Sequence, residues 1–290
     1  MKHAAASNAS ASSDDSARRA YWAAQMELGY EMVQKLIAFP VSECGECFAS
    51  IPDAAAAAGV EMLFSTSKIA GELDRVFQMR ESLVRDVIKI GREMNARGWI
   101  LKIEDGFRSL EMQGSLVRKP VLFDAILKKC IWETGGALPS AELVFRRAIV
   151  LIANMPKIGT HMSGSAIDVS VFHRDDGREV WRGNPYLEMS ERTPMRSIFV
   201  EPEFIENRLA ITAMMEAHGF MHFPFEFWHF NKGDAGAHIL TGNPAPCRYG
   251  PVNWNPRTNE VVPVADPLTP LNPLPVIEKE IVAAMERAKG

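Results

Sequence analysis

Two short stretches of the chain carry the side-chain types of a catalytic metal centre. They read HMSGSAID over residues 161–168 and EFWH over residues 226–229. Two imidazoles and one carboxylate can bind a divalent ion and leave one position open for water. We therefore predict that His161, Asp168 and His229 bind one Zn²⁺ per chain. The ligand types alone leave manganese and iron open.

A second acid and an arginine complete the chemistry of hydrolysis. Glu226 is not needed as a ligand, and we predict that it is the general base for the metal-activated water and passes the proton to the departing amine. Glu226 and His229 have an odd separation, so the strand that holds them must end, twist or bulge between them. Arg108 follows an apolar run, and we predict that it stabilises the oxyanion of the tetrahedral intermediate, a contribution of roughly 3–4 kcal/mol.

Apolar spacing predicts both helices and strands around these residues. Helices are expected over residues 16–40, 72–97, 119–153, 205–218 and 276–289. The third of them is broken near residues 135–139. Strands are expected over residues 99–104, 166–172, 220–223 and 225–230. Because helices and strands do not alternate regularly, we predict an α+β fold with a central antiparallel sheet flanked by helices.

Composition and these elements divide the chain into four parts. Residues 1–15 are rich in Ala, Ser and Asn and are predicted to be disordered. Residues 16–72 are an N-terminal helical extension, irregular from residue 41 onward, and residues 73–243 are the catalytic domain. Residues 244–290 form a Pro-rich tail, and its C-terminal helix is expected to pack on that domain.

The overall composition argues against several classes of protein. A net charge of −4 speaks against nucleic-acid binding. No run of residues approaches the roughly 20 apolar positions of a membrane-spanning helix. Four cysteines are too few for a disulfide scaffold, which favours a reducing compartment. Cys44 and Cys47 have the spacing of a redox or half-zinc motif, but no second pair accompanies them and we interpret them as structural.

The combined motifs resemble a known family of enzymes. The pattern Thr160-His161-x-x-Gly164-x-Ala166-x-Asp168, with Glu226-x-Trp228-His229 and Gly106-Phe107-Arg108, is similar to the D-alanyl-D-alanine dipeptidase (VanX-type) branch of the zinc DD-peptidases, peptidase family M15. The resemblance covers roughly residues 73–232. It implies a compact zinc DD-peptidase fold of the Hedgehog/DD-peptidase-like type with a small, closed cavity. It also implies the same metal ligands, base and arginine that the residue types suggest.

Two positions depart from the pattern of that family. Thr160 stands where the family usually has serine, and it keeps the hydroxyl group. Leu187 stands where the family has an acid for the free amino group of the substrate, and burying that ammonium unpaired would cost several kcal/mol. Either Glu188 or Glu191 replaces the missing acid, or the substrate is not simple free D-Ala-D-Ala. We assign substrate binding to a set of four residues: Thr160, Ser165, Glu188 and Trp228.

These observations predict a zinc metallopeptidase of peptidoglycan (cell-wall) metabolism that hydrolyses D-Ala-D-Ala or a related short peptide. One alternative is a peptidase or amidase for another dipeptide, a muropeptide or a natural-product amide. A second alternative is a zinc-stabilised binding domain without turnover. We expect a small peptide as the only partner, with no nucleic acid or membrane, and a bacterial cytoplasmic location. Export, which Arg18-Arg19 would suggest, and homo-oligomer formation are left open.

Overall fold

A five-stranded sheet lies at the centre of the computed structural model, which describes the backbone of residues 2–289 and the side chains of residues 14–289. In spatial order the strands are β2 (Met62–Phe64), β4 (Trp99–Asp105), β5 (Ala166–His173), β7 (His229–Asn231) and β6 (Met221–His222). Helix α3 (Glu81–Ala96) joins β2 to β4 as a crossover, so this pair is parallel, while the other pairs are antiparallel. The predicted α+β class is confirmed, and the correction is that the sheet is mixed.

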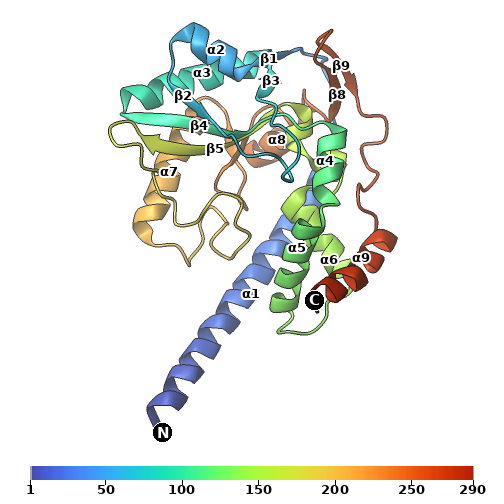
Figure 1. Cartoon of the computed structure of the whole chain (residues 1–290). Coiled ribbons are helices and arrows are strands. Elements are labelled where there is room, and N and C mark those ends of the chain that lie inside the picture. Colours follow the sequence, from blue (N-terminus) through green and yellow to red (C-terminus); the bar gives the residue numbers. More distant parts are fainter. Residues whose placement is uncertain (1, 290) are drawn as a thin grey trace.

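One face of the sheet carries the main hydrophobic core. Residues Ile167, Val169 and Val171 of β5 point to this face and pack with α2 (Ile51–Ala58), α3 and α7 (Pro202–Ala217). Figure 1 shows α2 and α3 running along the sheet. Since side chains alternate along a strand, Asp168 must point to the opposite face. The alternation of β5 therefore separates packing residues from the predicted metal ligand.

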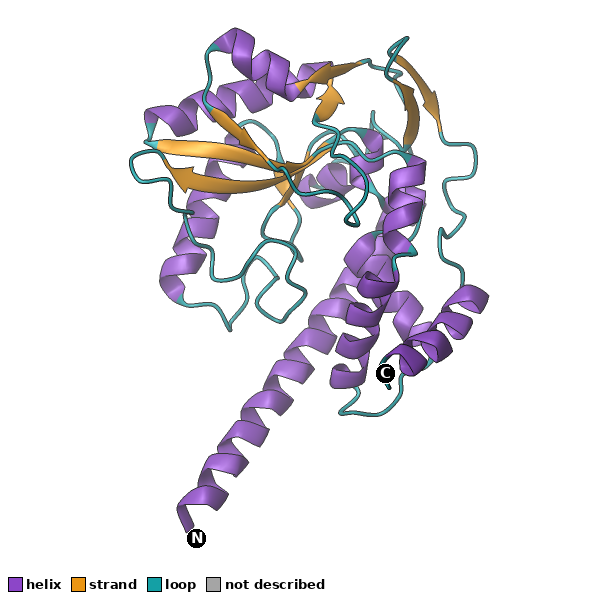
Figure 2. Ribbon diagram, viewed as in Figure 1, coloured by secondary structure: helices purple, strands orange, loops and turns teal. Residues whose placement is uncertain are grey.

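A second group of helices lies beside the sheet, on the side away from α2 and α3, and extends outward from it (Figures 1 and 2). It consists of α1 (Lys2–Ala38), α4 (Leu110–Val117), α5 (Pro120–Glu133), α6 (Ala141–Ile152) and α9 (Leu274–Arg287). Trp22, Met26, Val33 and Leu36 of α1 are buried in a cluster with Val150 of α6. A further cluster joins α5, α6 and α9. The C-terminal helix thus packs on the helical layer.

The remaining elements are short and lie around the sheet. Strands β1 (Phe48–Ser50) and β3 (Gln78–Arg80) form one pair, and β8 (Val252–Asn255) and β9 (Glu260–Pro263) form another. Two 3-10 turns and one helix complete the chain: Pro156–Ile158, Thr160–Ser163 and α8 (Ala235–Thr241). Among the described residues, none of the helices combines the length and the apolar character needed to cross a bilayer.

Several element boundaries differ from those predicted. The helix expected from residue 72 begins at Glu81, because residues 78–80 pair with β1 instead. Residues 41–72, expected to be irregular, contain β1, α2 and β2, and the Pro-rich tail contains the β8–β9 hairpin. Helix α1 begins at Lys2 rather than near Ser16, within the segment whose composition suggests disorder. Long amphipathic elements were located well, whereas short strands were not.

Candidate metal centre and its cavity

The three predicted ligands converge on one point at the edge of the helical layer. Asp168 of β5 lies directly opposite His229 of β7, and His161 lies in the 3-10 turn that leads into β5. All three side chains are buried, and one ligand atom from each lies within 4.8 Å of the others. Asp168 Oδ1 is 3.3 Å from His161 Nε2 and 3.0 Å from His229 Nδ1. The sheet register thus assembles two nitrogens and one oxygen.

The outward-facing nitrogens of both imidazoles have their own partners. His161 Nδ1 donates to the carbonyl of Gly106 at 2.7 Å, and His229 Nε2 is 2.9 Å from Thr160 Oγ1. Such bonds fix the ring orientation and leave the opposite nitrogen free for an ion. Burial opposes the charge of Asp168, but the two imidazoles hold its pKa well below the usual value. A buried, ionised carboxylate between two oriented imidazoles fits a zinc-type ion.

A glycine and a buried arginine shape the turn that holds His161. Gly164 ends this turn with φ +69°, and a Cβ there would lie 2.3 Å from the ring of Phe48. Only glycine suits that backbone and that space. Arg80, 0% exposed, donates from Nε to the carbonyl of Ser163 at 2.7 Å, and its guanidinium lies 5.0 Å from the rings of Phe48 and Tyr249. Arg80 also pairs with Glu43 at 3.0 Å.

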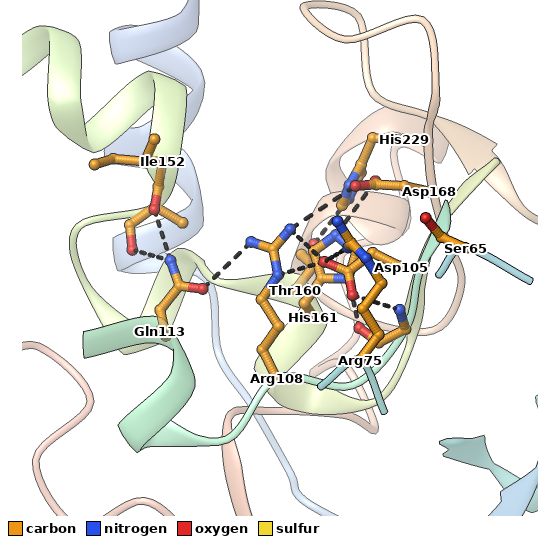
Figure 3. Close-up of polar contacts among 12 residues, drawn as sticks. Ser65, Arg75, Asp105, Arg108, Gln113, Ile152, Thr160, His161, Asp168 and His229 are labelled. Carbon is orange, nitrogen blue, oxygen red and sulfur yellow. Dashed lines mark hydrogen bonds and ion pairs between the residues drawn. The ribbon is translucent and has the colours of Figure 1, made fainter. Parts of the chain in front are cut away.

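Arg108 lies beside the metal centre on the turn that follows β4. Its guanidinium contacts Asp105 at 2.7 Å and lies 3.8 Å from Asp168 Oδ2 (Figure 3). Asp105 is shared with Arg75 at 3.2 Å. Burial lowers the pKa of Arg108, but the carboxylates of Asp105 and Asp168 outweigh burial and raise it above the usual value. Arg108 is therefore a fixed positive charge beside the predicted ligands.

Glu226 lies in a turn before β7 rather than in the strand itself. The amide of His229 donates to the carbonyl of Glu226 at 3.2 Å, and β7 begins only at His229. This turn removes the conflict that the odd spacing of the two residues posed. Burial raises the pKa of Glu226 to about 7, with Asp168 acting in the same direction and His229 and Arg108 opposing it. A carboxyl of this kind can exchange protons near neutral pH.

A cavity of about 210 Å³ joins the metal centre to the helical layer. Its polar end contains the three predicted ligands together with Arg108 and Glu226. Its other walls are apolar and include side chains from α1, α4, α5 and α6: Val33, Leu36, Leu116, Leu122, Ile149 and Ile152. The predicted catalytic residues thus face one cavity, open to solvent at its edge, of a size suited to a small molecule.

The four predicted substrate-binding residues divide into two pairs. Thr160 and Trp228 line the cavity, with the hydroxyl of Thr160 on His229. Ser165 does not, because its hydroxyl is buried against Ser163 and Asp234, each at 2.5 Å. Glu188 is exposed and lies outside the cavity lining. We therefore withdraw the assignment of Ser165 and Glu188 to substrate binding.

Sequence reasoning missed two residues that contact the predicted catalytic groups. Asp105 follows the strand predicted over residues 99–104 and was given no role, although an acid that ends an apolar strand and is followed by arginine is a usable signal. The bulge between Ile103 and Asp105 places this carboxylate opposite Asp168. Tyr186 donates from its hydroxyl to Asp168 Oδ2 at 2.9 Å. It comes from an irregular loop, and no local pattern marks it.

Comparison with known proteins supports the resemblance seen in the motifs. Residues 136–247 match the model of the Peptidase_M15 family, described as D-ala-D-ala dipeptidase. The D-alanyl-D-alanine dipeptidase of Enterococcus faecalis is 32% identical over 75 residues, 26% of this chain and 37% of that protein. The enzyme of the same name from Escherichia coli is 33% identical over 92 residues, 31% of this chain and 47% of that protein.

A third relative gives the same picture. The D-alanyl-D-alanine dipeptidase of Enterococcus faecium is 29% identical over 90 residues, 31% of this chain and 41% of that protein. The chain therefore spans less than half the length of each of these relatives. The segment that matches the family includes the three predicted ligands and Glu226, whereas Arg108 and α1 precede it. The predicted resemblance is confirmed: residues 136–247 match the M15 peptidase family of D-alanyl-D-alanine dipeptidases.

Proposed function

We propose that this protein is a zinc-dependent peptidase that hydrolyses the peptide bond of a short D,D-peptide of the D-Ala-D-Ala type. One observation carries the proposal: three oriented ligands, a protonatable acid and a fixed arginine line the same cavity. The similarity to D-alanyl-D-alanine dipeptidases supports the same reaction. In this role the protein would act on small peptides of bacterial peptidoglycan metabolism, and we expect the cytoplasm as its compartment.

His161, Asp168 and His229 would hold the ion. A zinc ion in this position supplies Lewis-acid activation of water and of the scissile carbonyl. The protein supports the ion through the partners of its ligands, since Gly106 and Thr160 orient the two imidazoles and Tyr186 binds the free oxygen of Asp168.

Glu226 moves the protons of the reaction. In its ionised form it accepts a proton from the attacking water, whose oxygen forms the new C–O bond. It then gives this proton to the nitrogen as the C–N bond breaks, so the products are one free carboxylate and one free amine. Burial raises the pKa of Glu226 in the metal-free protein, and a bound divalent cation would lower it again, which favours the ionised form that accepts the proton.

Arg108 stabilises the charge that develops on the carbonyl oxygen. Its guanidinium is held by Asp105 at 2.7 Å and by Gln113 at 3.4 Å (Figure 3). A charge that is already in place costs no reorganisation when the oxyanion forms. Asp105 is a positioning residue in this scheme, because it contacts Arg108 and Arg75 rather than the reacting atoms.

Release of D-Ala from D-Ala-D-Ala and related short peptides by the zinc-loaded protein tests the proposal. Glu226→Gln should abolish release while elemental analysis still finds about one zinc per chain. Glu203→Gln is the matched control, since this acid is exposed on α7 far from the cavity lining. Hydrolysis that survives Glu226→Gln would contradict the assigned base. Tight peptide binding without any turnover in the unmodified protein would favour a binding domain instead.

A further inference from the structure

We propose that the cavity selects short peptides whose amino end is capped by a small apolar acyl group, so that a dipeptide with a free ammonium is a poor substrate. This inference rests on the proposed function and names the substrate class of the same site. It depends on the carboxylates of the cavity, on the chemistry of its far wall and on the backbone of Leu187.

Every carboxylate among the described residues that line the cavity is already engaged. These carboxylates are Asp105, Asp168 and Glu226. Asp105 is paired with Arg75 and Arg108, and Asp168 lies between the two imidazoles. Glu226 is needed as the base. No acid is left to neutralise a substrate ammonium.

The other charges of the cavity also disfavour binding of an ammonium. Arg75 and Arg108 are the buried cations of the lining, and Lys68 at its edge is paired with Asp74 at 3.2 Å. A divalent cation added to these two arginines outweighs the three carboxylates, so the total becomes positive. An ammonium would then be brought into a partly buried space of its own sign, which costs free energy.

The two acids next to Leu187 that could replace a missing carboxylate do not reach the cavity. Glu188 is exposed and lies outside the lining. Glu191 is paired with Arg18 at 2.6 Å and with Lys129 at 3.4 Å. The structure therefore removes both replacements that the sequence left open.

Apolar side chains surround Leu187, the position at which the chain departs from the pattern of the family. Leu187 lines the main cavity and also an adjoining space of about 40 Å³, which reaches Trp22 and Met26 of α1. Glu226 and Trp228 line both spaces, so the smaller one opens directly beside the predicted base. Burying each methylene of an acyl group there would raise the affinity roughly fourfold.

The backbone of Leu187 is itself unusual. Its φ of +66° is in the left-handed region, which asparagine, aspartate and glycine adopt far more readily than leucine. The side chain is 50% exposed, so core packing does not account for it. A left-handed backbone is unfavourable for leucine. Its presence on the rim of the cavity therefore points to a role for its apolar surface.

Hydrolysis of D-Ala-D-Ala and of its N-acetyl and N-butanoyl forms tests the inference. We expect kcat/KM at least about tenfold higher for the N-acetyl form than for the free dipeptide, mainly through KM, and a further rise for the butanoyl form. Leu187→Asp should raise kcat/KM for the free dipeptide at least about tenfold and lower it for the capped forms. Both aspartate and asparagine suit the left-handed backbone, so the variant should fold.

Two control variants isolate the charge at position 187. Leu187→Asn removes the leucine and suits the same backbone, but it adds no charge and should give no gain with the free dipeptide. Ile198→Asp adds the same charge at an exposed residue outside the cavity lining and should leave the preference for capped peptides unchanged. A preference of the unmodified protein for the free dipeptide overturns the inference, and equal gains for Leu187→Asn and Leu187→Asp overturn the role assigned to charge at this position.

Binding measured without turnover separates this inference from the proposed function. Calorimetry of the zinc-loaded Glu226→Gln protein should show tighter binding of the N-acetyl dipeptide than of the free one. If this holds while the unmodified protein hydrolyses neither peptide, the proposed function fails and the selectivity stands. If the free dipeptide binds more tightly, the selectivity fails whether or not hydrolysis occurs.

Discussion

The two ends of the cavity are built in opposite ways. The metal end consists of strand and turn residues, and the predicted ligands and the arginine have defined partners there, as His161 has Gly106 and Arg108 has Asp105. The far end consists of helical side chains such as Val33 and Leu36, which line the cavity and offer a bound molecule only dispersion contacts. Hydrogen bonds fix positions closely, whereas apolar walls change shape with each side chain. In the proposed function, the metal end would carry out the chemistry and the far end would select the substrate.

The same division appears in the comparison with relatives. The predicted ligands and Glu226 lie inside the segment that matches the dipeptidase family, whereas α1 lies outside it. A helix that precedes the matched segment therefore forms part of the cavity wall. Changes at the metal end should affect the rate for every substrate, while changes on the helical wall should affect some substrates more than others.

Loss of a metal ligand is the strongest test of the metal end. Asp168→Asn keeps the shape of the side chain but removes the negative charge between two imidazoles. We expect at least about a thousandfold loss of hydrolysis and loss of zinc, both measured on the same sample. His218→Asn is the matched control, because this histidine pairs with Glu93 outside the cavity lining. Zinc that stays at full occupancy in Asp168→Asn would contradict the ligand assignment.

Removal of Arg108 should cost less than loss of the ion. Arg108→Ala is expected to lower kcat by roughly 10²–10³, or about 3–4 kcal/mol, because the oxyanion loses its fixed charge. Steady-state kinetics with a capped and an uncapped dipeptide should show the same factor for both. A loss confined to one substrate would mean that Arg108 recognises the peptide rather than the transition state.

Titration of Glu226 makes the metal-free protein less stable as the pH rises. Burial raises the pKa of Glu226 from the 4.5 of an ordinary glutamate to about 7, so the folded state binds the proton more tightly. Protonation of Glu226 contributes at most about 3 kcal/mol to the free energy of unfolding. This contribution is fully present below pH 4.5 and is lost as the pH rises toward 7. Glu226→Gln should therefore be more stable than the unmodified protein at pH 8 in chelator. Thermal unfolding at pH 4 and pH 8 measures this, and equal differences at both values would refute it.

The apolar wall should respond in KM and in stability. Leu36→Ala opens space beside the cavity and removes a buried side chain, so we expect a loss of about 2–3 kcal/mol in the free energy of unfolding. KM for N-butanoyl-D-Ala-D-Ala should rise more than KM for the free dipeptide. Denaturant unfolding and steady-state kinetics measure the two effects. A uniform fall in kcat with unchanged KM would contradict the proposed role of the wall.

The sequence predicted which residues meet at the candidate site better than it predicted their surroundings. His161, Asp168, Glu226 and His229 were chosen by type and spacing, and the structure places them around one cavity. The long periodic elements β4, β5, α3 and α7 were also predicted. Asp105 and Tyr186 were missed because their contacts with the site depend on a bulge and on an irregular loop. Sequence distance alone could not place them.

The errors have physical causes of the same kind. Ser165 lies within the predicted metal-binding motif, but it directly precedes β5 and its hydroxyl is held by Ser163 and Asp234 away from the cavity lining. Glu188 follows a residue with positive φ, and the loop directs it to solvent. The parallel β2–β4 pair arises from the crossover through α3, which no local pattern reveals. The directions of these side chains and the pairing of these strands depend on tertiary structure, which local sequence patterns do not reveal.

Because of Arg80, folding of the turn that holds His161 requires segments from distant parts of the polypeptide. Its partner Ser163 lies 83 positions away, and the residues that enclose its guanidinium include Glu43 and Tyr249 from opposite parts of the chain. Synthesis proceeds from the amino terminus, and such distant contacts form late. We therefore expect a ribosome-bound chain that has not yet exposed Tyr249 to capture metal poorly. Loading would then be an event of the released protein.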